Sequence, residues 1–259
     1  MSSEIVRTEE GDGVLTVWLN RPEKRNALNR ALVEALSLTL ASARARDEVR
    51  VLLLRGKGPD FCAGADLVEL EGMLGQTREE GLADARRLGA LLLSMRRHPK
   101  PIIAAVQGRA LAGGCGLATA CDMILARDDA ELGYPEVRLG FVPAMVMAIL
   151  RRKLTEGRAF DLVTSGNRIT AEEALSIGLV SRVLPTAEFD EQVSAFAADL
   201  AERPSSALSL TKSLLYEQAD LSVDEGIERG AQVNVQARET DACMDGIRAF
   251  LDRKRGSRR

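Results

Sequence analysis

The chain has 259 residues, of which 46 % are hydrophobic and 28 % are charged, so it can bury a substantial core in one large domain or in one domain with an appendage. Its formal net charge of only −3 excludes a strong global field for nucleic acid or for an anionic membrane surface. There is no run of about 18 apolar residues and no secretory signal pattern at the amino terminus, so we expect a cytoplasmic protein that does not bind a membrane.

Cysteine, histidine and the basic residues each exclude a class of site. The four cysteines form no CxxC pair and have no neighbouring histidine, so we expect neither a metal site nor a disulfide framework. The only histidine, His98, lies in a connection before Pro99, where we expect it at the surface, and this argues against Ser-His-Asp or Cys-His catalysis. The basic run over 253–259 is interpreted as a solvated tail.

Taken in chain order, strand patterns alternate with helical patterns and then give way to helices. Strands are predicted over 14–19, 51–54, 102–106, 122–126, 130–133 and about 179–183. Helices are predicted over 29–45, 77–97, 187–202, 205–219 and 223–253. Asn29 is a predicted N-cap, and Thr77 with Glu80 and Thr170 with Glu173 form predicted capping boxes. The alternation predicts an α/β fold with a parallel or mixed sheet, followed by a helical appendage that mediates assembly.

Two glycine-containing corners follow buried strands. The corner over 107–117 joins a strand to a helix through Gly113, Gly114 and Gly116, and a second corner over 60–67 precedes a helix that Asp66 is expected to cap. Either corner alone can be close packing or a capped helix start. Together they could place two backbone amides around one oxygen, which is what a reaction that forms an enolate needs.

An ordered set of motifs over residues 14–185 resembles the enoyl-CoA hydratase/isomerase (crotonase) family. These motifs are Asn20-Arg21-Pro22 with Asn26-Ala27-Leu28-Asn29, the segment 61–67, the glycine corner ending in Cys121-Asp122, Tyr134-Pro135-Glu136-Val137-Arg138-Leu139-Gly140 with Pro143, and 169–174 through 178–180. The resemblance implies a crotonase-like spiral of ββα units over 1–190 and a helical trimerisation region over 191–259. It also implies a homotrimer or a dimer of trimers.

The resemblance also implies site residues for a coenzyme A thioester. The thioester carbonyl is expected between the backbone amides of Ala63 and Gly113, which form the oxyanion hole. Residues expected to bind coenzyme A are Asn26, Ala27, Leu28, Ala65, Asp66 and Leu67, together with Phe250 and Arg253 from a neighbouring subunit. Arg253 stands where the family usually has lysine, which keeps the charge but changes the donor geometry. Coenzyme A is part of the substrate, and no separate cofactor is expected.

Glu136 matches the family glutamate that exchanges a proton at C2 of the acyl group. Without the resemblance, it reads as an acidic residue in a first turn after Pro135. Gly116 stands where well-known hydratases carry a second glutamate that activates water. Glu69 and Glu71 are speculative substitutes, and otherwise they are solvent-facing charges on a helix. Met145 and Met147 are expected either to reshape the acyl pocket or to pack in the core.

These expectations define an enzyme of acyl-CoA metabolism. The leading reaction is reversible hydration of a 2-enoyl-CoA through an enolate stabilised by the oxyanion hole. The alternatives are isomerisation of a 3-enoyl-CoA to a 2-enoyl-CoA with one glutamate, and a non-catalytic or RNA-binding crotonase-like protein. The RNA-binding alternative is motivated only by the basic tail, and no nucleic-acid partner is expected.

Overall fold

The computed structural model describes residues 4–256, so residues 1–3 and the last three residues of the basic tail lie outside the described part. A six-stranded sheet has the order β1-β2-β3-β4-β6-β9, in which β1 pairs antiparallel with β2 and the other pairs are parallel. The strands are β1 (Val6–Gly11), β2 (Val14–Leu19), β3 (Val51–Gly56), β4 (Ile102–Val106), β6 (Met123–Arg127) and β9 (Arg182–Leu184). The predicted α/β class is confirmed.

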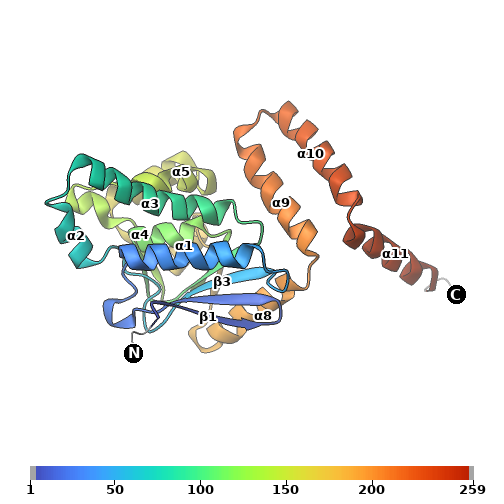
Figure 1. The fold of residues 1–259 in the computed structure, drawn as a ribbon, viewed down its shortest axis with the longest axis horizontal. Helices are drawn as coiled ribbons and strands as arrows, with labels where there is room; N and C mark the ends of the chain where they lie inside the picture. The colour runs from blue at the N-terminus through green and yellow to red at the C-terminus, as the bar shows by residue number, and fades with distance from the viewer. Residues whose placement is uncertain (1–3, 257–259) are drawn as a thin grey trace.

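Side-chain alternation along the central strands supplies a core on each face of this sheet. In β3, Leu52 and Leu54 face one apolar cluster, whereas Val51 and Leu53 face another. The first cluster is covered by α1 (Arg30–Arg44), α3 (Arg78–Arg96) and α4 (Gly113–Ala120), and the second by α8 (Phe189–Ala201) (Figure 1). The α8 helix therefore packs as part of the core, although the helical region was expected to begin at 191.

A second, three-stranded sheet stands beside the first. It has the order β5-β7-β8, with β5 (Arg109–Leu111) parallel to β7 (Glu131–Gly133) and β7 antiparallel to β8 (Arg168–Thr170). The remaining helices of the core are α2 (Leu67–Met73), α5 (Ala144–Lys153), α6 (Glu156–Ser165) and α7 (Ala171–Ser176), with the short 3-10 helices η1 (Pro22–Lys24), η2 (Pro135–Leu139) and η3 (Thr186–Glu188).

Most helix starts are those that the sequence predicts. The Asn29 side chain accepts a hydrogen bond from the Leu32 amide, and both predicted capping boxes are present. His98 differs from its prediction, because it is buried with its Nε2 atom 3.2 Å from the Leu40 carbonyl oxygen. Burial lowers the pKa of His98 to about 4, so the ring is a neutral core group.

The carboxy-terminal helices are α9 (Ser205–Glu217), α10 (Val223–Arg238) and α11 (Asp241–Gly256), with η4 (Gln218–Asp220) between the first two. They extend away from the core on the side opposite α2 (Figure 1). The single helix predicted over 223–253 is wrong. Thr240 interrupts it, because its hydroxyl accepts a hydrogen bond from the Cys243 amide and so caps a new helix. None of the helices in residues 4–256 is both long and apolar enough to cross a bilayer.

A buried charged contact attaches α9 to the core. Lys212 Nζ donates to the carbonyl oxygens of Met95 and Lys100, at 3.1 and 3.0 Å, and to the Asp122 carboxylate at 2.8 Å. Tyr216 Oη donates to the other oxygen of the same carboxylate. A buried ion pair of this kind is costly to break, because removal of one partner leaves the other as a buried charge that neither water nor an opposite charge stabilises.

Replacing Lys212 by alanine should therefore lower the free energy of unfolding by about 3 kcal/mol, since Asp122 is left as a buried charge without its cation. Urea denaturation followed by circular dichroism measures the change. Ser213→Ala is the matched control, because Ser213 is the next residue on α9 and is exposed. Equal denaturation midpoints for the two variants would contradict this role of Lys212.

Candidate active site

The strand pairings bring three distant segments to one place. Leu111 of β5 pairs with Gly133 of β7, so the segments that continue toward Gly113 and Glu136 leave the sheet at the same edge. Isolated bridges add two further segments, because Cys62 pairs with Ala110 and Leu28 pairs with Ala65. The residues expected to form the site are therefore assembled by backbone pairing before any side chain is considered.

Glycine allows the two corners to pack backbone against backbone. A Cβ atom on Gly114 would lie 2.2 Å from the Cys62 carbonyl oxygen, which no other residue could accommodate without a shift. Gly64 adopts a φ of +109° and packs against Ala112, whose Cβ would lie 3.2 Å from a Cβ at position 64. The predicted juxtaposition of the two corners is present in the structure.

The Gly113 amide is unpaired at the start of α4. Ala112 has a φ of 50° and a ψ of −126°, and this unusual conformation turns the chain from β5 directly into the helix. Within the described residues, the helical bonds begin at the Gly116 amide, which donates to the Ala112 carbonyl, and the Gly113 amide has no acceptor. Gly113 therefore remains available as an oxyanion-hole donor.

The structure corrects the prediction for Ala63. Its amide donates to the Arg25 carbonyl at 3.0 Å, so it is already used inside the chain. Among residues 4–256, the Ala65 amide has no acceptor, although its neighbours pair with Leu28 on both sides. Ala65 is also exposed, so its amide is the donor that this corner leaves free. The sequence carries no signal for this choice, because it does not show which amides are taken by pairing.

Glu136 lies in η2, three residues beyond the pairing at Gly133. Its side chain is half-buried, and its Oε2 atom is buried without a hydrogen-bond partner. Burial raises the pKa of the Glu136 carboxyl, and only its own backbone amide opposes the shift. The Glu136 charge also contributes to the raised pKa values of Cys115 and Tyr134. A carboxylate with a raised pKa and a free oxygen can accept and return a proton.

Position 116 supplies no second acid, and Glu69 and Glu71, the possible substitutes, have other surroundings. Gly116 is buried, and a Cβ there would lie 3.5 Å from Val146 Cβ of α5, so the neighbouring space is apolar. Glu69 Oε1 accepts a hydrogen bond from the Arg30 amide at 3.1 Å and so caps α1 rather than facing a substrate. Glu71 is exposed on α2. The reading of Glu69 and Glu71 as helix charges is thus favoured.

Two of the residues expected to contact coenzyme A have polar side chains that are already bonded within the chain. The buried Asn26 side chain accepts from the Arg21 amide and donates to the carbonyls of Lys57 and Asp60. Asp66 pairs with Arg21 at 2.7 Å and caps α2, and the Arg21 guanidinium lowers the pKa of this carboxyl. Both side chains therefore hold the loops together, so a ligand at Asn26 or Asp66 could contact only their backbone.

The other expected contacts lie in two separate regions. Ala27 and Leu28 are buried, whereas Leu67 is exposed on α2. Phe250 and Arg253 are exposed on α11, at the far end of the molecule from α2 (Figure 1). The structure of one chain does not bring them to Glu136, so they could reach this kind of site only in a neighbouring chain.

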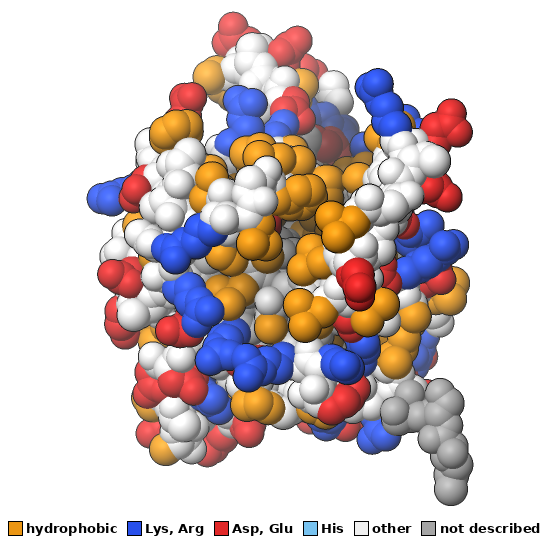
Figure 2. Space-filling model, turned by 90° about the vertical axis from the view of Figure 1, so that its left-hand side faces the viewer, with side chains coloured by type: hydrophobic (Ala, Val, Ile, Leu, Met, Phe, Trp, Pro, Cys, Tyr) orange, Lys and Arg blue, Asp and Glu red, His pale blue; other side chains and the backbone are white. Residues whose placement is uncertain are grey.

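The end of the molecule that carries α2 has an apolar surface. Exposed apolar side chains occur on α2 and in the segment that leads into α5, among them Leu67, Val68, Phe141 and Val142. Figure 2 views this end and shows apolar side chains gathered around a hollow, with lysines and arginines along one border. Met145, just beyond, packs against Gly89 of α3, and Met147 is exposed. In the described residues, no group of three potential ligands could hold a metal ion.

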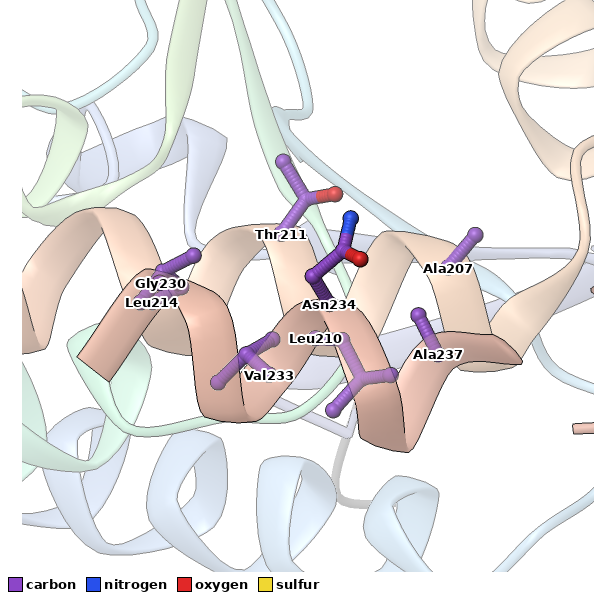
Figure 3. Close-up of a pocket in the computed structure, with 8 residues that line it drawn as sticks. All are labelled: Ala207, Leu210, Thr211, Leu214, Gly230, Val233, Asn234 and Ala237. Atoms are coloured by element: carbon purple, nitrogen blue, oxygen red, sulfur yellow. The ribbon is translucent and has the colours of Figure 1, made fainter. Parts of the chain in front are cut away.

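A separate groove of about 210 Å³ runs between α9 and α10 (Figure 3). Small and apolar side chains line most of it, and its residues are Ala207, Leu210, Thr211, Leu214, Gly230, Val233, Asn234 and Ala237. It contains no titratable side chain, so it offers no group for acid-base chemistry. It is therefore distinct from the site that Glu136 occupies.

Known proteins are similar to this chain in fold and in sequence. Solved enoyl-CoA hydratases from Mycobacterium smegmatis and Bacillus anthracis superpose with TM-scores of 0.91 at 28 % and 30 % sequence identity, covering 96 % of this chain and 96 % and 97 % of theirs. This agreement defines the crotonase fold.

The sequence similarity extends along the whole chain. The sequence model for enoyl-CoA hydratase/isomerase matches residues 9–257. A Thermus thermophilus protein provisionally named an enoyl-CoA hydratase is 39 % identical over 96 % of this chain and 98 % of its own length. The 2,3-dehydroadipyl-CoA hydratase of Escherichia coli is 34 % identical over 98 % and 97 %. The chain belongs to the enoyl-CoA hydratase/isomerase family and is an enzyme of that type.

The raised pKa of Glu136 sets an expected pH dependence. A base must be ionised to accept a proton, so kcat/KM for an enoyl-CoA should fall as the pH is lowered through a value above the ordinary glutamate range. Stopped or continuous assays over a pH series measure this acid limb. Glu71→Gln removes an exposed carboxylate and should leave the limb unchanged. An acid limb at the ordinary glutamate pKa would show that burial does not tune this group.

Proposed function

We propose that the protein catalyses the reversible hydration of a 2-enoyl-CoA thioester. The thioester oxygen accepts hydrogen bonds from the amides of Ala65 and Gly113, and these donors stabilise the negative charge that develops there. The observation that carries the proposal is the partnerless, buried oxygen of Glu136, on a segment that leaves the same sheet edge as the helix that presents the Gly113 amide. Preorganised donors of this kind contribute about 3 kcal/mol to a transition state.

The proton transfers can be written with Glu136 as the only acid-base group. Ionised Glu136 removes a proton from water as the water oxygen bonds to C3, and the electron pair of the C2–C3 double bond moves onto the thioester oxygen. The resulting enolate takes the proton back from Glu136 at C2, which gives a 3-hydroxyacyl-CoA. The carboxylate is then ready for another cycle.

Isomerisation is the second candidate, and the apolar space at Gly116 favours it. Glu136 would take a proton from C2 of a 3-enoyl-CoA and return it at C4, so that no water needs to be held. A Cβ at position 116 would face Val146, so the space beside it is apolar. The relatives named as hydratases favour hydration, whereas the single carboxylate favours the proton shift.

Coenzyme A enters this proposal as part of the substrate. The backbone of residues 26–28 and 65–67 would line the adenine and pantetheine portions, because the polar side chains there are committed to structural bonds. Phe250 and Arg253 would contact the phosphates from an adjacent subunit of a homotrimer or a dimer of trimers. The groove between α9 and α10 (Figure 3) offers an apolar surface for such assembly.

Products from two substrates test the reaction directly. Incubation with crotonyl-CoA should yield 3-hydroxybutyryl-CoA if the protein is a hydratase. Incubation with a 3-enoyl-CoA would give the 2-enoyl isomer if the protein is an isomerase. Mass spectrometry identifies hydration by the added water, and absorbance of the conjugated thioester reports isomerisation. Isomerisation without hydration would replace the leading reaction by the second, and turnover of neither substrate would contradict both.

Glu136→Gln should lower kcat by about 10³-fold, because the amide cannot exchange a proton. Acyl-CoA affinity, measured by isothermal titration calorimetry, should change little, since the oxyanion donors and the loops remain. The melting temperature should stay the same or rise, because a buried carboxylate without a partner is removed. A variant that retains wild-type kcat would exclude Glu136 as the acid-base group.

A further inference from the structure

Two fully buried hydroxyl groups meet between the helix that carries Gly113 and the segment that carries Glu136. Thr119 Oγ1 of α4 and Tyr134 Oη lie 2.7 Å apart, and both residues are 0 % exposed. Tyr134 stands two residues before Glu136 and immediately before η2. The contact therefore joins the two elements that supply the chemistry of the proposed function.

This contact is a specific polar interaction in an apolar setting. The neighbours of Thr119 on α4 are the buried Leu117, Ala118 and Ala120. A hydroxyl buried there without a partner would cost about 1–3 kcal/mol, so each of the two groups depends on the other. Burial holds the pKa of Tyr134 far above its ordinary value, and the phenol stays protonated and able to donate.

The backbone supplies a second tie between the same elements. The Ala112 amide donates to the Gly133 carbonyl at 2.9 Å, at the base of the corner. This bond adjoins the pairing of β5 with β7, so it ties the two elements at the edge of the small sheet. The bond between the two hydroxyls adds a point of attachment farther along α4, at Thr119.

We propose that Thr119 and Tyr134 are a positioning pair, which fixes the Glu136 carboxylate relative to the Gly113 amide through their hydrogen bond. Neither residue needs to touch the substrate. The inference rests on the proposed function for its kinetic readout, and it adds a determinant of rate that lies outside the oxyanion hole and the acid-base group. Misplacement of reacting groups by about 1 Å is enough to cost a large factor in rate.

Three variants test the pair: Tyr134→Phe, Thr119→Val and the double variant. Each single variant should lower kcat about 10-fold with little change in KM, and the double variant should be no slower than the singles because both remove one interaction. Tyr216→Phe is the control, since it removes the oxygen of a half-buried phenol that bonds to Asp122 under α9. It should lower stability and leave kcat unchanged.

Titration of Glu136 gives a readout that does not depend on turnover. Carbon-13 NMR of glutamate-labelled protein, with Glu136→Gln for assignment, should show a pKa nearer the ordinary value in Tyr134→Phe, because a loosened segment lets the carboxylate reach water. Tyr216→Phe should titrate as the wild type does. Inactive wild-type protein would contradict the proposed function alone, whereas unchanged kcat and unchanged Glu136 titration in Tyr134→Phe would overturn the positioning pair.

Discussion

The parallel pairing of β5 with β7 is the constraint on which the site depends. It fixes Leu111 opposite Gly133, so the oxyanion helix and the acid-base segment leave one sheet edge in register. Glycine at position 133 allows the backbones to pack closely here, because a Cβ at Gly133 would lie 2.5 Å from the Asn167 carbonyl oxygen. The chemistry is thus placed by backbone geometry, and side chains refine it.

Polar groups around the site divide into those that are satisfied and those that are not. The loops and helix starts around the site are held by hydrogen bonds and an ion pair from the side chains of Asn26, Asp66 and Glu69. By contrast, the Oε2 atom of Glu136 and the amides of Ala65 and Gly113 have no partner within the described residues. Buried polar groups are normally paired, so this contrast separates the groups that build the site from those left for a ligand.

Periodicity and caps predicted most central elements, since the apolar run of β3 and the Asn29 cap are decided locally. The β1 strand was not predicted, because its exposed, polar residues become a strand only through pairing with β2. The corner around Ala63 was predicted, but the identity of its free amide was not. The Ala63 amide is paired with the carbonyl of Arg25, which lies in a loop 38 residues earlier in the chain. Tertiary contacts of this kind have no local signature.

The apolar space at Gly116 also bears on how this fold acquires new reactions. A Cβ atom there would meet only ordinary contacts with Val146, so the backbone of α4 accepts a residue other than glycine at this position. In the genetic code, a glycine codon that ends in a purine becomes a glutamate codon by one base change. Where position 116 has such a codon, one base change would supply a second acid, and the backbone that presents the Gly113 amide would be the frame for a one-carboxylate or a two-carboxylate enzyme.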